Sequence, residues 1–356
     1  VVVRARRCAV GAGRAQGASV VVPAEAKAEA KRSAKLDPTL AEFAGEYLQG
    51  HARPNKKTWT KDQRQLEKNV LPHIGSKKLA ELRRKDIVRA LNPLKEAGKP
   101  VEHTRTLAVV RKMLNYAVGV GALEASPATH IPQMREDSRE RVLSREEIRA
   151  LFTELDGMNL WPATRDALEL ILRTAQRPGE VRNMEWAEVD QDRGQWIIPA
   201  QKTKNGEQQV VPLTAKALEV LDRAAGLARD SRWVFPASRG SNPIGEGTMS
   251  QAMKRAINPA ERPGKDADPE AEPIMERATP HDLRRTAATL ITELGFNRLV
   301  VDKLLNHKDQ TVGGVYDRHS YDKEKRLALE AWERELDATF SGQSQGAEVV
   351  DIATAR

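Results

Sequence analysis

Apolar positions recur with the period of amphipathic helices over the first third of the chain. Asp37-Pro38-Thr39 opens one such helix, whose apolar stripe comprises Leu40, Phe43, Ala44, Tyr47 and Leu48. Three further helices are predicted near residues 58–70, 84–91 and 104–120. Breaks are expected where glycine and proline interrupt the pattern, at Gly75, Pro93 and 98–100. This part of the chain is therefore expected to form a small helical domain.

A polar, charged stretch at 132–141 then predicts a linker to a second domain. Ser144 follows it, and Glu147 stands three positions later, which is the spacing of a capping box at the start of a helix. A long helix is predicted near 162–174, and a last helix near 323–336. The second domain is therefore also mostly helical.

A β-hairpin is expected between these helices. The runs 196–198 and 210–211 are rich in β-branched and aromatic residues, and they flank Asn205-Gly206, a strong signal for a short turn. The fold class that follows is mainly α with a small antiparallel β-hairpin or sheet, that is, an α+β fold.

Composition narrows the class of protein. The chain has 356 residues, and a net charge of +8 with a pI near 9.5 favours a polyanionic partner such as nucleic acid. The bias is strongest in 51–140, where 19 Lys and Arg stand against 10 Asp and Glu. The single cysteine excludes intramolecular disulfides and a cysteine-based zinc site. The sequence has no apolar run of membrane-spanning length and no signal-peptide pattern, so a cytoplasmic, nucleoid-associated protein is expected.

The stretch that begins at Thr279 carries the most specific chemistry. Thr279 is predicted to cap a helix, Pro280 to occupy its first position, and Asp282 to complete a capping box. His281 and Arg284 then share one face of the first turn, beside a helix N-terminus that favours anions. These residue types indicate phosphate chemistry.

Further motifs stand before and after this stretch in the sequence. His281-x-x-Arg284 is followed by Leu-Leu-Asn-His307 and, nine residues later, by Tyr316; upstream stand Arg177, in Thr-Ala-Gln-Arg-Pro-Gly-Glu, and Lys204, directly before Asn-Gly. This set resembles the signature of the tyrosine recombinases, the phage integrase family. The resemblance extends over roughly residues 37–336.

The resemblance implies a division of the chain and a function. The expected parts are a poorly ordered segment 1–36, a helical core-binding domain 37–131, the linker 132–141, a catalytic domain 142–340 and a tail 341–356. It implies a site-specific recombinase that cleaves and rejoins duplex DNA through a covalent 3′-phosphotyrosine, in order to integrate or excise a mobile element or prophage. The candidate phosphate contacts in the basic segment are Arg83, Arg84, Lys85, Arg105, Arg111 and Lys112.

Partners and cofactors follow from the same resemblance. Double-stranded attachment sites, a homotetramer on two DNA sites and accessory DNA-bending or excision factors are expected as partners. The helix after Tyr316 is expected to pack on a neighbouring protomer. Neither a cofactor nor a metal is expected. Nothing before residue 37 has the pattern of an arm-binding domain, which puts regulation by distal DNA arms in doubt.

The residue types suit this chemistry. Two guanidiniums, Arg177 and Arg284, can hold the phosphoryl oxygens on which charge develops. A tyrosine with a pKa of about 10 needs a base such as His281, and the departing 5′ oxygen needs an acid such as Lys204. His307 is expected to hydrogen-bond the phosphate.

Each residue also has a structural alternative. Arg177 could form an ion pair with Glu180, Lys202 could replace Lys204, and His281 could be an ordinary surface residue. His307 could be a core histidine, and Tyr321 could be the nucleophile if Tyr316 were buried. Related enzymes with another outcome remain alternatives, such as a type IB topoisomerase or a telomere resolvase, as do a catalytically silent DNA-binding protein and a metal nuclease. One departure from the family pattern is Asn306, which stands where glycine is usual and which tolerates the left-handed conformation.

Overall fold

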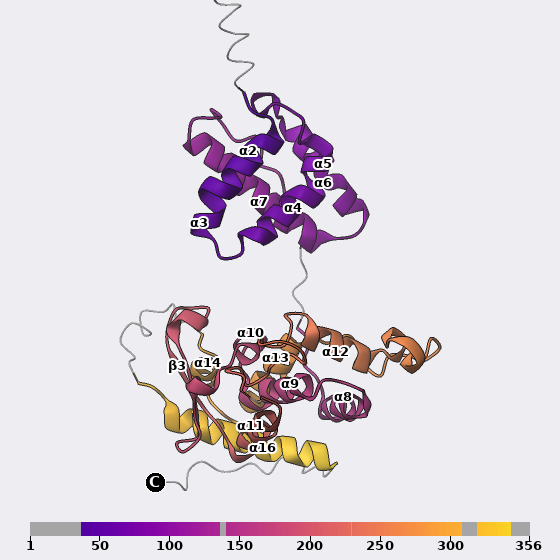
Figure 1. Ribbon diagram of the computed structural model, residues 1–356, viewed down its shortest axis with the longest axis vertical. Coiled ribbons are helices and arrows are strands. Elements are labelled where there is room, and N and C mark those ends of the chain that lie inside the picture. Colours follow the sequence, from indigo (N-terminus) through magenta and orange to yellow (C-terminus); the bar gives the residue numbers. More distant parts are fainter. Residues whose placement is uncertain (1–36, 136–139, 229, 308–318, 343–356) are drawn as a thin grey trace, which may run out of the picture. The chain divides into compact units, whose positions relative to one another are not determined.

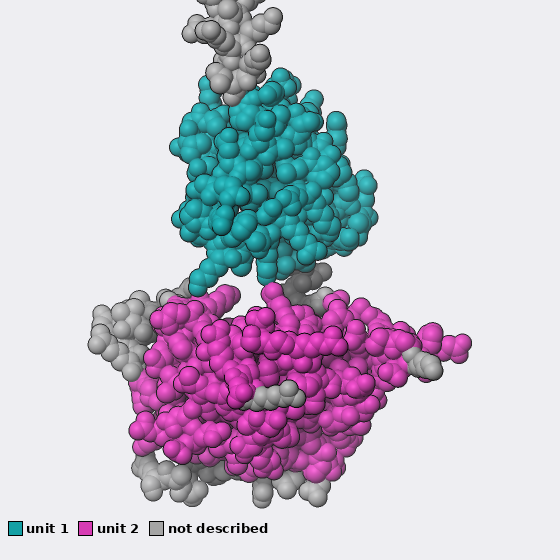
Figure 2. Space-filling view, viewed as in Figure 1, with its two compact units in different colours: residues 1–138 teal, residues 139–356 magenta. Residues whose placement is uncertain are grey.

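The computed structural model describes residues 37–135, 140–228, 230–307 and 319–342. The chain folds into two compact units, residues 1–138 and residues 139–356, shown in different colours in Figure 2. The predicted segment 1–36, Tyr316 and nearly all of the predicted tail lie outside the described residues. Each unit is described here by itself.

Unit 1 is helical. Its α-helices are α2 (Leu40–Tyr47), α3 (Arg53–Asn55), α4 (Trp59–Asn69), α5 (Leu71–Ile74), α6 (Arg84–Glu96) and α7 (Pro100–Gly119). The predicted start of the first helix is confirmed, since Thr39 and Glu42 form a reciprocal capping box. A π-helical turn, Leu48–Ala52, joins α2 to α3.

The core of unit 1 lies between α2, α4, α6 and α7. Leu40, Leu66, Ile87 and Leu107 contribute one side chain from each of these helices, and each is fully buried. Helix α6 extends through Pro93, where the sequence predicted a break. The helix continues because its apolar side chains remain in the core on both sides of Pro93, which offsets the loss of one backbone hydrogen bond.

The other α-helices of the described residues lie in unit 2 (Figure 1). They are α8 (Arg145–Gly157), α9 (Pro162–Thr174), α10 (Pro178–Arg182), α11 (Ala215–Ala228), α12 (Thr248–Ile257), α13 (Pro280–Glu293), α14 (Arg298–Leu304) and α16 (Asp322–Ser341). Every residue of helix α9 from Ala167 to Thr174 is buried, and α11, α12 and α13 all pack against this helix. This central helix leads directly into the segment that carries Arg177.

A small antiparallel sheet lies beside these helices. Its strands are β1 (Val189–Asp190), β2 (Gln195–Ile198) and β3 (Gln209–Pro212), in the order β1-β2-β3, with Trp196 opposite Val211. The α+β fold class and the β2–β3 pairing are therefore confirmed. The connection between them is longer than the expected short turn, because pairing stops at Ile198 and Gln209. The intervening loop, 199–208, presents Lys204 and Asn205.

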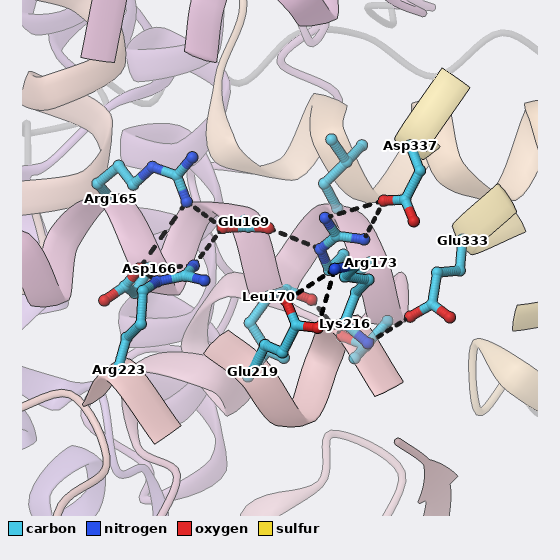
Figure 3. Close-up of polar contacts among 12 residues, drawn as sticks. Arg165, Asp166, Glu169, Leu170, Arg173, Lys216, Glu219, Arg223, Glu333 and Asp337 are labelled. Carbon is cyan, nitrogen blue, oxygen red and sulfur yellow. Dashed lines mark hydrogen bonds and ion pairs between the residues drawn. The ribbon is translucent and has the colours of Figure 1, made fainter. Parts of the chain in front are cut away.

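An ionic cluster ties α9 to α11 and α16 (Figure 3). The carboxylate of Glu169 on α9 accepts hydrogen bonds from Arg165, from Arg173 Nε at 2.7 Å and from Arg223 Nη2 at 2.5 Å. Arg173 also lies 3.5 Å from Asp337 of α16. Three helices are thereby connected around one buried carboxylate.

Helix α16 packs on its own chain. Leu329, Trp332 and Leu336 are buried, and Trp332 Nε1 donates to the carbonyl of Leu172 on α9 at 2.8 Å. The helix contacts α8, α9, α13, α14 and β3. The buried side chains of α16 are thus covered within unit 2, and packing of this helix on a neighbouring protomer stays a prediction.

Candidate active site

Side chains from four separate segments of unit 2 meet around one pocket of about 840 Å³. The segments are the turn between α9 and α10, the loop 199–208, the start of α13 and the end of α14. The predicted site residues that line the pocket are Arg177, Lys204, His281, Arg284 and His307. Five of the six predicted catalytic residues are thus brought together, and the sixth, Tyr316, lies outside the described residues.

The first turn of α13 fixes two of these residues. The carboxylate of Asp282 accepts hydrogen bonds from the backbone N–H of Thr279 at 2.9 Å and from its hydroxyl at 2.7 Å. The predicted cap is confirmed in this form. His281 and Arg284 are three positions apart, so both are directed from this turn to the same pocket.

Arg284 is a buried cation with fixed donors. Its Nη1 donates to the carbonyl of Ala175 at 2.8 Å, and its Nη2 donates to the carbonyl of Leu305 at 2.6 Å. Ala175 adopts the left-handed conformation, with φ of 54°, directly after α9. Burial and the nearby charge of Arg177 lower the pKa of Arg284 to about 10. The guanidinium is therefore held in a fixed orientation, and a bound anion would stabilise its positive charge.

Arg177 is oriented by a carboxylate. Its Nη1 donates to Glu180 at 2.9 Å, and its Nη2 lies 3.4 Å from the carbonyl of Asn306. The side chain of Glu180 is only 4% exposed, whereas that of Arg177 is 19% exposed. The structural alternative for Arg177 is thus real but does not exclude function, because the ion pair orients a guanidinium that still lines the pocket.

Lys202 and Lys204 differ in their surroundings. Lys202 Nζ donates to the carbonyl of Asn183 at 2.9 Å, pairs with Glu185 at 2.7 Å and also with Glu188, so its donors have fixed partners. Lys204 is exposed and lines the pocket. The geometry therefore favours Lys204 over Lys202 as a residue that reaches bound phosphate.

His281 is positioned to remain uncharged. The residue is exposed and lines the pocket, where neighbouring atoms remove part of its hydration. This desolvation, together with the positive charges of Arg284 and Arg285, lowers the pKa of His281 below its ordinary value of 6.5. A neutral imidazole at neutral pH can accept a proton.

His307 follows a tight helix C-terminus. Its backbone N–H donates to the carbonyl of Asp302 at 2.9 Å, and Asn306, at φ of 49°, provides the left-handed residue of a Schellman-type motif. The ring Nδ1 lies 3.0 Å from the carboxylate of Asp302, and the side chain is 49% exposed. The core-histidine alternative is therefore wrong. Asp302 was not predicted from the sequence, since a carboxylate five residues before a histidine has no recognisable spacing.

The tyrosine alternative, Tyr321, lies at a different place. It directly precedes α16, with φ of 54°, and its ring lies 5.3 Å from Lys303 Nζ and 4.6 Å from the ring of His319. It packs partly against the core and is absent from the residues that line the pocket. The assignment of Tyr316 as nucleophile stays a prediction.

The basic candidates of unit 1 lie on α6 and α7 and in the residue before α6. Arg83, Arg84 and Lys85 are exposed, as are Arg105 and Lys112, which are seven positions apart on one face of α7. Arg111 instead donates to the carbonyls of Ala128 and Ile131 and holds the segment that follows α7. Its guanidinium therefore has a structural role in the free protein.

Metal-ligand clusters and membrane-spanning helices are both absent from the residues that the structure describes. Within it, no group of three or more His, Cys, Asp or Glu side chains is arranged to hold a metal ion. Within it, too, no helix is long and apolar enough to cross a membrane.

Comparison with known proteins places the chain in a family. The sequence model of the phage integrase family matches residues 141–323, and that of the phage integrase central domain matches residues 40–133. The chain belongs to the phage integrase family. Among its curated relatives is the prophage integrase IntA of Escherichia coli (strain K12), 25% identical over 284 residues, which are 78% of this chain. The match spans 65% of the length of IntA.

Solved structures agree in fold. A lambda integrase dimer bound to a COC′ core site matches with a TM-score of 0.62 at 20% identity, covering 77% of this chain and 96% of that one. A lambda integrase tetramer bound to a Holliday junction matches with a TM-score of 0.63 at 20% identity, covering 80% of this chain and 82% of that one. The chain therefore has the fold of the lambda integrase structures.

Proposed function

We propose that the protein is a site-specific tyrosine recombinase, which cleaves and rejoins duplex DNA and so integrates or excises a mobile element or prophage. The observation that carries this proposal is the meeting of two arginines, a lysine and two histidines from four segments around one pocket. Membership of the phage integrase family and the prophage integrase relative support it.

The arginines act on the scissile phosphate. Arg284 has a buried guanidinium whose contacts to two carbonyls fix its orientation, and Arg177 is held by Glu180. Both bind phosphoryl oxygens, on which negative charge increases in the transition state. Fixed donors of this kind need no reorganisation during the reaction, so the stabilisation is greatest for the transition state.

Proton transfer uses the remaining groups. The phenol oxygen of Tyr316 attacks phosphorus and forms the phosphotyrosine bond, while neutral His281 takes the phenolic proton. The bond from phosphorus to the 5′ oxygen breaks, and Lys204 donates a proton to that oxygen. His307, oriented by Asp302 at 3.0 Å, donates a hydrogen bond to a phosphoryl oxygen. Rejoining reverses each transfer, and no metal is required.

The partners in this proposal are double-stranded attachment sites and further copies of the chain. Exposed basic residues of unit 1 bind phosphates and supply most of the affinity. The lambda integrase tetramer on a Holliday junction supports four protomers on two sites. Accessory DNA-bending or excision factors belong to the same proposal, as does a cytoplasmic, nucleoid-associated location.

A trapping experiment tests the function. A nicked substrate that loses a short fragment after cleavage should trap a covalent 3′-phosphotyrosine adduct at Tyr316. Tyr316→Phe should abolish the adduct while DNA binding survives, and Tyr321→Phe, the matched control, should still form it. An adduct mapped to Tyr321, or a 5′ linkage, would contradict the assignment. Relaxation of supercoiled DNA without paired sites would indicate a topoisomerase instead.

A further inference from the structure

The C-terminal end of α14 is held by donors from the other segments of the site. The carbonyl of Leu304 accepts from the buried side chains of Gln176 at 3.0 Å and Gln209 at 2.7 Å. The next carbonyl, of Leu305, accepts from Arg284 at 2.6 Å. A helix leaves its last carbonyls without partners inside the helix, so these contacts both satisfy that end and bring the site together.

One contact at this end joins two side-chain amides. Asn205 Nδ2 donates to Asn306 Oδ1 at 2.7 Å, and Asn306 Nδ2 donates to Asn205 Oδ1 at 3.2 Å. Asn205 Nδ2 also lies 3.3 Å from the backbone carbonyl of Asn306. Both residues are half-buried. The pair connects the loop 199–208 to the residue directly before His307.

The backbone at position 306 does not itself require asparagine. With φ of 49° the position is left-handed, a conformation that glycine adopts with less strain. Glycine, the residue usual at this place in the family, would therefore serve the turn equally well. What asparagine adds is the second amide of the pair.

We propose that Asn306 is a positioning residue, which acts through Asn205 to hold Lys204 in reach of the departing 5′ oxygen. The inference rests on the proposed recombinase function. Lys204 is exposed and stands on an irregular loop, so movement of this loop would displace its ammonium in addition to the rotations of its long side chain. The residue next to it, Asn205, is the one that the amide pair fixes.

Position matters for this proton transfer. A proton donor must lie within hydrogen-bond distance, about 2.6–3.2 Å, of the atom that receives the proton. A displacement of about 1 Å can reduce a rate about 100-fold. Removal of the amide pair should therefore slow the step that needs Lys204 and leave the binding of DNA largely unchanged.

The test compares two leaving groups in one protein. Single-turnover cleavage is measured with a normal substrate and with one whose bridging 5′ oxygen is replaced by sulfur, which departs without a proton. Asn306→Gly should slow cleavage of the normal substrate about 10- to 100-fold and slow the sulfur substrate less than about threefold. Lys204→Ala should show the same selectivity more strongly. The double variant Asn205→Ala, Asn306→Gly should be no slower than the slower single variant, because each single substitution already removes the same amide pair.

Asn297→Gly is the matched control. Asn297 caps the other end of α14 through its side chain, which accepts from the N–H of Leu299 at 2.9 Å. This variant makes the same substitution in the same helix, so it should show no selectivity between the substrates. Equal reductions on both substrates with Asn306→Gly, or no reduction on either, would overturn the inference while leaving the recombinase function intact. A wild-type protein that forms no adduct with either substrate would overturn the proposed function, and this inference with it.

Discussion

Glu169 offers the sharpest test of how unit 2 is stabilised. Its side chain is 5% exposed, and three arginines surround its carboxylate: Arg165, Arg173 and Arg223 (Figure 3). Burial alone would raise the pKa of Glu169, but the charges of the three arginines outweigh it and hold the pKa below the ordinary value of 4.5. The change Glu169→Gln keeps the shape and removes the charge.

The expected magnitude follows from the exposure of the three arginines. Removing one partner of a buried ion pair costs about 3–5 kcal/mol when the other charge is left without compensation. Arg165 and Arg223 have side chains 23% and 45% exposed, so water can compensate them in part. Arg173 is 6% exposed, and its other carboxylate, Asp337, is 3.5 Å away. One stranded cation rather than three gives a loss of about 2–3 kcal/mol.

The control is Glu219→Gln. Glu219 pairs with Lys216 at 2.8 Å beside the same cluster, but the two side chains are 54% and 41% exposed, and such surface pairs contribute about 0–1 kcal/mol. Urea unfolding is followed by tryptophan fluorescence, which reports mainly on unit 2 because every tryptophan except Trp59 lies there. If Glu169→Gln costs no more than Glu219→Gln, the cluster does not stabilise the unit and the reasoning is refuted.

The contribution of Glu169 to the free energy of unfolding should depend on pH in a definite direction. Because the folded-state pKa of Glu169 is lowered, its contribution is present above the unfolded-state pKa and is lost as the pH falls through the folded-state pKa. The difference in unfolding free energy between the wild type and Glu169→Gln should therefore be largest near neutral pH and shrink in acid. A difference that stays constant between neutral pH and strong acid would contradict the assigned direction.

Three further predictions concern function. Replacing Arg83, Arg84 and Lys85 with alanine should weaken DNA binding and reduce the slope of log affinity against log salt by about 0.9 for each phosphate that is no longer neutralised, measured by a salt titration; an unchanged slope would mean that these side chains do not bind DNA. Because the pKa of His281 is lowered, cleavage should be constant at neutral pH and decline only below 6.5, and a decline that begins above 7 would contradict a neutral base. Strand cleavage should persist in excess EDTA, and complete inhibition that magnesium reverses would refute the metal-independent mechanism.

Local signals in the sequence were enough to predict much of the fold. The caps at Ser144 and Thr279 are each set by residues three positions apart, and both are present. Interactions between distant segments were not predictable in this way. The length of the loop 199–208 depends on where the pairing of β2 with β3 stops, and the place of α16 depends on contacts such as that of buried Trp332 with α9.

The residues of the candidate site likewise include some that were predictable from the sequence and some that were not. The motif residues could be named from the sequence because the resemblance specifies their types and order. Their supports could not, since Asp302 and Asn205 are ordinary polar residues until the fold places one beside His307 and the other against Asn306. The different surroundings of positions 202 and 204 also come from the fold, which surrounds Lys202 with the carboxylates of Glu185 and Glu188.

The electrostatics of the pocket explain why these supports are needed. Arg177 and Arg284 repel each other, and burial adds to the cost of charge on Arg284, as its lowered pKa indicates. Backbone carbonyls at the ends of two helices, α9 and α14, offset part of that cost with their partial negative charge. A phosphate bound by both guanidiniums would change repulsion into attraction. The free protein thus holds two cations close together at some expense in stability, and under the proposed function the binding of a scissile phosphate would remove that expense.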